Sequence, residues 1–343
     1  MIARLITVAL AAILAAGCHE GSGSPTLGRF VKAHRTAAEL ALANPEAGIE
    51  LVAGDGRSLG VVRLPASLAG GDNPAWSPDG RTLAFTADTD AASSGPLLPP
   101  TDVYVAPATG GRPRRVTTGR NAVSPTWSPD GRWIAYSVAS LVDKRRSAAI
   151  WVVHPDGTGA RELTPARANV FDLAGPYNLR TGLIAFTRCT RPVLLPGGME
   201  PDTCSVWTMN ADASHQRRLA TESEQPAWSA DGRRIVFASA RDHAARIRVG
   251  EDESSWIRQL YVMNADGSTQ RRLLTTATSD QWPSWAPGGA VIAYQATSRQ
   301  TSATTVGLVN ADGSCRRGLP PPAAGDERAP AWRPGGVAAR LIC

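Results

Sequence analysis

Six carboxylates stand a few residues before recurring tryptophans, and they are the side chains of this sequence best suited to bind a ligand. They are Asp72, Glu222, Glu224, Asp280, Asp326 and Glu327. Carboxylates that gather in one place attract a cation or a cationic peptide segment. Carboxylates in loops are more often simply solvated, so a binding role depends on whether the fold brings these six together.

The residue types needed for catalysis are too scattered to predict an active site. Nucleophilic catalysis needs a nucleophile beside a base, and metal chemistry needs ligands that converge on one point. The five histidines lie before the repeats described below, in predicted turns or in an insert, and they are His19, His34, His154, His215 and His243. The repeated Asp-Gly pairs are typical of tight turns, without the carboxylate spacing of a calcium loop. We therefore expect no catalytic residues, no metal and no cofactor.

One recurring phrase predicts the elements that position these side chains. Proline, a small residue and tryptophan precede a turn in five copies, at Trp76, Trp127, Trp228, Trp285 and Trp332. A degenerate copy at Pro176-Tyr177 fills the longest gap, and a second phrase, clearest at residues 259–267, alternates with the first. A period of about 50 residues with four strand-like segments per unit is typical of a β-propeller. We predict six blades of four antiparallel strands, named A to D from the axis outward, with the repeat tryptophans packed between blades.

The order of the phrases predicts how the ring closes. The propeller is expected at residues 48–343. It begins with a motif that predicts strands C and D, at 48–65, and ends with a motif that predicts strands A and B, at 329–343. The closing blade would then take two strands from each end of the chain, which removes two open sheet edges. A different register uses Glu39–Asn44 as an additional strand B. Pro45 and the run Leu341-Ile342-Cys343 favour the two-plus-two closure.

The repeats resemble those of TolB-like propellers, a family named after the periplasmic component of the Tol-Pal envelope system. The resemblance rests on Trp-Ser-Pro-Asp-Gly-Arg at 76–81 and 127–132 and on Tyr-Val-Met-Asn-Ala-Asp-Gly at 261–267. It implies a six-bladed fold and binding to envelope proteins or peptides. TolB carries a separate α/β domain before its propeller, whereas only residues 19–47 precede the first predicted strand here, so the resemblance implies a TolB-like lipoprotein and not TolB itself.

The first residues predict export and lipidation. Arg4 is followed by an apolar run from Leu5 to Leu14, too short for a permanent membrane span. Residues 14–17 resemble the lipobox that precedes a lipidated cysteine, so we expect a signal peptide at 1–17, a diacylated Cys18 and a linker to residue 47. An ordinary secretory signal is the alternative. The expected location is the cell envelope, with the chain anchored in a membrane through Cys18.

Four further cysteines fit an oxidising compartment. Cys189 and Cys204 flank one loop and are the favoured disulfide, which leaves Cys315 and Cys343 as the second pair. Metal binding by these residues is the weaker interpretation, because no Cys-x-x-Cys or His-Cys cluster accompanies them.

The net charge of +6 comes from scattered arginines, not from one basic element, so we expect no nucleic-acid binding. Arginine pairs fall on the predicted outer strands, where charge blocks edge-to-edge pairing, and a basic rim would also suit anionic headgroups. The pairs are Arg114-Arg115, Arg217-Arg218, Arg271-Arg272 and Arg316-Arg317.

The sequence thus predicts a monomeric, non-catalytic propeller that binds an envelope protein or peptide at a channel mouth lined by the six carboxylates. Two alternatives stay open. One is a propeller enzyme of the lyase or lactonase type with a channel metal. The other is a carbohydrate-binding or sensor module that uses Trp256 or Trp282, the aromatic residues outside the repeat.

Overall fold

The computed structural model describes most of the chain downstream of residue 38. The described residues are 39–44, 48–65, 68–88, 101–119, 121–190, 203–243, 246–248, 254–301, 303–319, 328–335, 338 and 340–343. Contacts divide the chain into two units, Met1–His34 and Arg35–Cys343, and every described residue belongs to the second. Cys18 with the predicted lipobox, and the carboxylates Asp326 and Glu327, lie outside the described residues.

The described residues form antiparallel sheets of four strands. One sheet has the order β26 (Arg328–Trp332), β1 (Glu39–Asn44), β2 (Gly48–Ala53) and β3 (Ser58–Val62). The next contains β4 (Ala69–Trp76), β5 (Thr82–Asp88), β6 (Thr101–Pro107) and β7 (Arg114–Arg115). Another contains β16 (Ser223–Trp228), β17 (Arg234–Ser239), β20 (Gln259–Asn264) and β21 (Arg271–Arg272). A further sheet contains β22 (Ser279–Trp285), β23 (Val291–Thr297), β24 (Thr304–Asn310) and β25 (Arg316–Gly318).

The remaining strands form a larger sheet and a small hairpin. The larger sheet joins β8 (Ala122–Trp127), β9 (Ile134–Val142), β10 (Arg145–Val153) and β11 (Arg161–Glu162) to β12 (Val170–Tyr177), β13 (Ile184–Thr190), β14 (Thr203–Met209) and β15 (Arg217–Thr221). In the sheet ladder, the two described sets of strands are joined through a parallel pairing of Ala148 with Phe171. The hairpin, β18 (Arg246–Arg248) and β19 (Ser254–Trp256), is inserted between β17 and β20.

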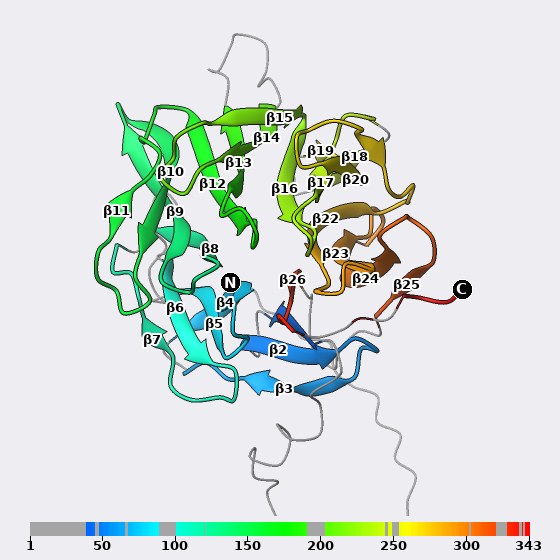
Figure 1. Ribbon diagram of the computed structural model, residues 1–343, viewed down its shortest axis with the longest axis horizontal. Coiled ribbons are helices and arrows are strands. Elements are labelled where there is room, and N and C mark those ends of the chain that lie inside the picture. Colours follow the sequence, from blue (N-terminus) through cyan, green and yellow to red (C-terminus); the bar gives the residue numbers. More distant parts are fainter. Residues whose placement is uncertain are drawn as a thin grey trace, which may run out of the picture. The chain divides into compact units, whose positions relative to one another are not determined.

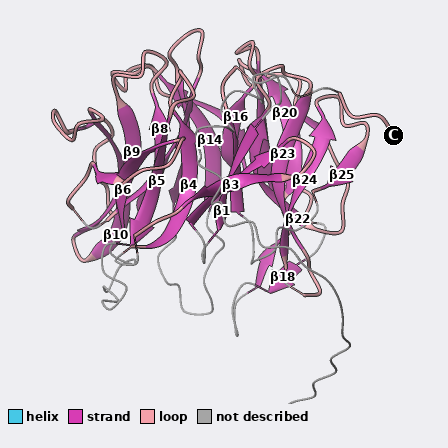
Figure 2. Cartoon of the chain, turned by 90° about the horizontal axis from the view of Figure 1, so that it is seen from below, coloured by secondary structure: helices cyan, strands magenta, loops and turns pink. Residues whose placement is uncertain are grey.

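The sheets surround a common centre, which makes the fold an all-β propeller (Figure 1). Their inner strands contact one another in a closed ring that runs β26, β4, β8, β12, β16, β22 and back to β26. Turns that follow the inner strand and the third strand of each sheet lie on one face, called here the turn face. The opposite face, called the loop face, holds the β17–β20 connection with the β18 hairpin (Figure 2).

The turn after each inner strand is fixed by a serine and an aspartate of the repeat. After β4, the Ser77 hydroxyl donates to Asp79 Oδ1 at 2.6 Å, and the Arg81 amide donates to the same oxygen at 3.0 Å. Gly80 has φ of 66°, where a residue without a Cβ is favoured. The hydrogen bond from Ser77 lowers the pKa of Asp79, and Ser128 does the same for Asp130. These aspartates therefore serve the turns, as the Asp-Gly pattern predicts.

The repeat tryptophans lie in the core between neighbouring sheets. Trp76, Trp127, Trp228, Trp285 and Trp332 are each at most 8% exposed. Three of them also donate the indole N–H across the boundary between sheets. Trp76 bonds to the carbonyl oxygen of Ala331, Trp127 to that of Ala75 and Trp332 to that of Ser284, at 3.1 to 3.2 Å.

The predicted two-plus-two closure is wrong. The closing sheet takes three strands from the N-terminal part of the chain and one, β26, from the C-terminal part, because β1 pairs with β2 along its whole length and with β26 on its other side. Leu40 and Leu42 of β1 are fully buried, so this segment supplies the apolar strand that the closing sheet needs. The propeller therefore begins at residue 39 and not at 48.

The residues expected to form the last strand have a different role. The Leu341 amide donates to Asn310 Oδ1 at 2.8 Å, and Asn310 Nδ2 donates to the Leu341 carbonyl oxygen at 3.1 Å. Cys343 forms a disulfide with Cys315, and Cys189 forms one with Cys204. Segment 340–343 is thus fastened to the turn between β24 and β25 instead of joining the closing sheet.

Within the described part of the chain, no helix has the length and apolar character needed to cross a bilayer.

Candidate functional site

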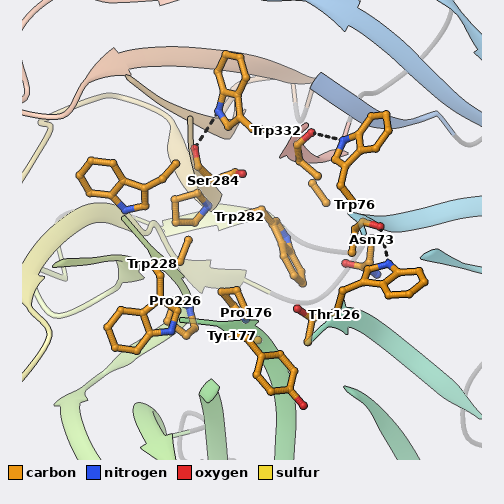
Figure 3. A pocket seen from close by; sticks show the side chains of 18 of the residues that line it. Asn73, Trp76, Thr126, Pro176, Tyr177, Pro226, Trp228, Trp282, Ser284 and Trp332 are labelled. Atoms are coloured by element: carbon orange, nitrogen blue, oxygen red, sulfur yellow. Dashed lines mark hydrogen bonds between the residues drawn. The ribbon is translucent and has the colours of Figure 1, made fainter. Parts of the chain in front are cut away.

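A cavity of about 500 Å³ occupies the centre of the ring (Figure 3). Its walls come from the inner strands β4, β8, β12, β16, β22 and β26, and most lining residues are proline, alanine or tryptophan. Along every inner strand except β8, it extends from the residue that precedes the proline to the turn that follows the same strand. A cavity of this volume, apolar with few polar groups, has the character of a ligand site in proteins.

The prolines of the repeat shape the inner strands. Proline lacks the N–H that a sheet ladder needs, so it occurs in sheets at edges and bulges. The register between inner and second strand shifts around it, for example between Glu224 and Ala227 and between Gln281 and Ser284. The residue before the proline has a left-handed backbone with φ of 46° to 55° in five strands, at Asn73, Ser124, Gln225, Trp282 and Ala329. All five line the cavity.

Side chains of neighbouring strands hold these bulges in place. The amide of Gln225 donates to the hydroxyl of Thr187 at 2.9 Å, and the amide of Trp282 donates to Gln225 Oε1 at 2.9 Å. In β12 the position belongs to Gly175, where a Cβ would come within 2.4 Å of the Ala185 carbonyl oxygen. Left-handed backbone at residues other than glycine costs free energy and tends to gather at functional sites, which directs attention to this ring of residues.

Trp282 is the most prominent side chain of the site. Its indole projects into the middle of the cavity (Figure 3) and is half-buried, unlike the repeat tryptophans, which are packed between sheets. Trp256, the other aromatic residue outside the repeat, lies elsewhere and stacks on His243 with 4.9 Å between ring centroids. The two tryptophans singled out from the sequence therefore belong to different places, and only Trp282 lines the cavity.

The described members of the predicted carboxylate set do not line the cavity together. Of the four that are described, only Glu224 lines the cavity, and it forms an ion pair with Arg258. Glu222 lies at the surface, with its Oε2 at 3.4 Å from His243 Nε2. The carbonyl oxygen of Asp72 accepts a hydrogen bond from the Thr86 hydroxyl at 3.1 Å, but Asp72 is not part of the lining. The predicted acidic mouth is therefore not formed by the described carboxylates.

Asp280 is fully buried and points away from the cavity. Its carboxylate accepts hydrogen bonds from the hydroxyls of Thr276 at 2.7 Å and Thr278 at 2.6 Å. Burial raises the pKa of Asp280 to about 6, against the smaller opposing effect of these two hydrogen bonds. Its role is structural, in the connection that leads from β21 into β22.

Two other buried aspartates were not anticipated from the sequence, and both are structural. Asp102 pairs with Arg115 and accepts a hydrogen bond from the Thr117 hydroxyl at 2.7 Å. Asp172 accepts two hydrogen bonds from Arg188, at 2.6 and 2.8 Å. Among the described residues, no three His, Cys, Asp or Glu side chains are grouped so that they could hold a metal ion.

Apart from Trp282, the lining positions before the prolines were also not recognised from the sequence. The x-Pro-x-Trp spacing recurs in the sequence, but it does not predict that the residue before the proline turns toward the axis. Among these positions Asn73, Ser124 and Gln225 are polar, and Glu224 is the only charged side chain among the described lining residues. The site is thus a nearly neutral, mostly apolar cavity.

Comparisons with known proteins support the fold. The crystal structure of TolB from Acinetobacter baumannii has a TM-score of 0.60, with 17% sequence identity over 87% of this chain and 67% of that one. The crystal structure of a nidogen/laminin complex gives a TM-score of 0.61, with 16% identity over 88% of this chain and 100% of that one. At these identities the likeness shows the fold alone, a TolB-like β-propeller.

Sequence comparisons reach only part of the chain. The Tol-Pal system protein TolB of Zymomonas mobilis is 38% identical over 73 residues, which are 21% of this chain and 15% of that protein. The uncharacterized peptidase YuxL of Bacillus subtilis is 40% identical over 68 residues, which are 20% of this chain and 9% of that protein. The chain thus matches only a small share of either relative's length. No protein-family profile matches the chain.

Proposed function

We propose that this chain is a TolB-like, non-catalytic scaffold of the bacterial cell envelope whose central cavity binds an apolar segment of a partner protein or peptide. The observation that carries the proposal is the half-buried indole of Trp282 in the middle of an apolar cavity of about 500 Å³. Tryptophan is among the residue types most enriched at the energetic centres of protein interfaces.

The character of the lining argues for an apolar ligand and against the cationic one expected from the sequence. Glu224 is the single carboxylate among the described lining residues, and Arg258 already balances its charge. An incoming ammonium or guanidinium group would lose its hydration without gaining a free counter-charge, which costs free energy. An apolar side chain loses no such hydration and gains contact with proline rings and the indole.

The ring is proposed to have six blades, with the larger sheet counted as two. Its two sets of four strands each follow the order of the other sheets, and one pairing of Ala148 with Phe171 joins them. The six copies of the repeat in the sequence agree with this count. The bridge would then be a contact between neighbouring blades, made possible by the long β9–β10 hairpin.

An envelope location is proposed from two observations. The residues before Cys18 resemble a lipobox, which implies export and a lipid anchor. The structure contains two disulfides, which persist in oxidising compartments and are rare in the cytosol.

A carbohydrate is the second candidate ligand, and Trp282 is again the reason. Indole rings in concave sites also pack against the C–H face of a sugar ring, and Asn73, Ser124 and Gln225 would supply hydrogen bonds to hydroxyls. This alternative differs from the first in its ligand and not in its site.

The experiment that tests the proposed function is selection of ligands from a random peptide library and from a glycan array, with the parent protein and Trp282→Ala in parallel. We expect the parent to enrich peptides that contain apolar or aromatic side chains and the variant to enrich none of them. Trp256→Ala is the matched control because Trp256 lies outside the cavity. Selection of Arg- or Lys-rich peptides, or equal enrichment by the Trp282 variant, would contradict the proposal. Glycan binding that depends on Trp282 would favour the second candidate.

A further inference from the structure

The arginine pairs of the outer strands recur in four places around the ring, in one register in three of them and shifted by one residue in β25. Arg114 lies opposite Val105, Arg217 opposite Thr208, Arg271 opposite Val262 and Arg316 opposite Val309, and each is followed by a second arginine. Each pair forms the first two residues of its outer strand, directly after the turn that leads into that strand. The pairs therefore lie next to the turn face. All eight side chains are exposed.

The aspartates of the turn face do not cancel this charge. In the turns after β4, β8 and β16, each aspartate has an arginine two positions later: Asp79 with Arg81, Asp130 with Arg132, and Asp231 with Arg233. Those turns are therefore close to neutral. Asp102 compensates Arg115, and Asp242 compensates Arg272. The turns after the third strands of the three sets β12–β15, β16–β21 and β22–β25 carry three exposed aspartates, Asp212, Asp266 and Asp312, the last paired with Arg340. The exposed Arg217, Arg218, Arg271, Arg316 and Arg317 outnumber the two that remain, which leaves an arc of net positive charge at the turn side of these three sets.

Exposed apolar side chains lie on the same face. Leu179, in the turn after β12, is 58% exposed, and Ile342 is 97% exposed. Ile342 belongs to the segment that is fastened by the Cys315–Cys343 disulfide and by the hydrogen bonds between Leu341 and Asn310, so it is held beside Arg316 and Arg317. Trp133, half-buried, stacks on His154 with 3.8 Å between ring centroids and has Arg161 over its ring.

The chain also enters the propeller from this face. β1 is antiparallel to β26, and Glu39 lies beside Arg333, directly after the end of β26. The segment that connects Cys18 to the propeller is therefore joined to it at the turn face. By contrast, several charges near the loop face are paired with partners there, as in Glu224 with Arg258 and Asp172 with Arg188.

From these observations we infer that the turn face binds the surface of an anionic lipid bilayer. Arginines attract the phosphate groups and negative potential of such a surface, while Leu179, Ile342 and Trp133 fit the boundary between headgroups and acyl chains. Bound in this way, the loop face points away from the membrane, and the end of the cavity lined by the turns points toward it. The inference uses neither the identity of the cavity ligand nor Trp282.

The test measures partition of the full chain onto vesicles of phosphatidylcholine, with or without phosphatidylglycerol. Every protein in the test carries Cys18→Ser, so that no acyl chain contributes to binding. Every protein also keeps residues 1–38, so that any lipid affinity of this segment is the same in all of them. The charge variant combines Arg218→Gln, Arg271→Gln and Arg317→Gln. Because each basic residue near an anionic surface contributes roughly fivefold to partition, we expect this variant to lose well over tenfold on the anionic vesicles.

The matched control removes three exposed basic residues near the loop face: Lys144→Gln, Arg145→Gln and Arg299→Gln. It is expected to bind anionic vesicles as the parent does. Leu179→Ser is expected to weaken binding, whereas Leu141→Ser, at a residue 53% exposed in the β9–β10 hairpin, is not. The inference is overturned if the parent does not prefer anionic vesicles, if the charge variant binds them unchanged, or if the loop-face control loses as much. An unchanged charge variant would point instead to an acidic protein as the partner of these arginines.

Discussion

The indole N–H of Trp332 donates a hydrogen bond to the carbonyl oxygen of Ser284 at 3.1 Å, which ties the closing sheet to the sheet before it. On the other side of the same strand, the carbonyl oxygen of Ala331 accepts the indole N–H of Trp76 at 3.1 Å. β26 is thus fastened on both sides by its last two residues. Since β26 is the one strand of the closing sheet that comes from the C-terminal part of the chain, ring closure depends strongly on this pair of contacts.

Substitution of Trp332 is expected to destabilise the propeller, by an amount that depends on the residue that replaces it. Trp332→Phe removes the hydrogen bond and part of the ring, and should lower the free energy of unfolding by about 1 to 2 kcal/mol. Trp332→Ala also leaves a cavity between sheets and should cost about 3 to 5 kcal/mol. Urea denaturation measures both values, with Trp282→Ala as the control whose effect should be clearly smaller, because Trp282 is half-buried. Equal losses for Trp332→Ala and Trp282→Ala would contradict the placement of Trp332 in the core.

Leu42→Ala tests the three-plus-one closure. Leu42 is 1% exposed in β1, so its truncation should cost about 2 to 5 kcal/mol of unfolding free energy, as for other buried leucines. Ile342→Ala, at a residue 97% exposed, should change stability by less than about 0.5 kcal/mol. If residues 39–44 were a linker, Leu42→Ala would leave the unfolding midpoint unchanged.

Asp280 should make the stability of the propeller depend on pH. Its folded-state pKa of about 6 lies above the ordinary value of 3.8, so the protonated form is favoured by folding. The corresponding stability is fully present below pH 3.8 and is lost as pH rises through 6. The difference between these two pKa values corresponds to a free energy of about 3 kcal/mol.

The comparison that isolates this effect is Asp280→Asn, which keeps the shape without the ionisation. Relative to the variant, the parent should lose up to about 3 kcal/mol of unfolding free energy as pH rises from 4 to 7. Denaturation curves at a series of pH values measure the difference between the two proteins. Parallel pH profiles would show that Asp280 does not titrate in this range.

The disulfide between Cys189 and Cys204 should stabilise the β13–β14 hairpin. The two residues lie directly opposite each other in the ladder, 15 positions apart in sequence, and a loop of that length corresponds to about 3 kcal/mol in the chain-entropy description. The double substitution Cys189→Ser with Cys204→Ser should lower the free energy of unfolding by roughly that amount. Under reducing conditions the parent and the double variant should be equally stable, because Cys315–Cys343 is then reduced in both. A double variant as stable as the parent without reductant would count against a formed Cys189–Cys204 disulfide.

The repeat phrases predicted most of the fold because each one combines several independent local constraints. Trp127 supplies the inter-sheet core, Ser128 and Asp130 fix the turn, and Gly131 allows its positive φ. The ring closure was mispredicted because its decisive segment, residues 39–44, lies outside any recognisable copy of the phrase and is followed by Pro45. The alternative register, with Glu39–Asn44 as a strand, was the correct one, and its pairing with β26, far away in sequence, is what decides between the two.

The site was harder to predict because a bulge changes which residues of a strand face the axis. Simple alternation along β22 does not show that Trp282 turns into the cavity while Asp280 is buried away from it. The left-handed residue before each proline resets the register, and a one-residue shift moves every following side chain to the other face. The described carboxylates do not form the predicted acidic mouth, although Glu224 and Trp282, which both line the cavity, were among the residues singled out from the sequence.

The most direct test of the binding role is calorimetric titration of the parent, Trp282→Ala and Trp256→Ala with a peptide recovered by selection on the parent. Loss of a central tryptophan contact should raise the dissociation constant of Trp282→Ala by about thirtyfold or more, corresponding to about 2 kcal/mol, while Trp256→Ala binds as the parent does. Affinity that is unchanged by Trp282→Ala would contradict the assignment of the central cavity as the binding site.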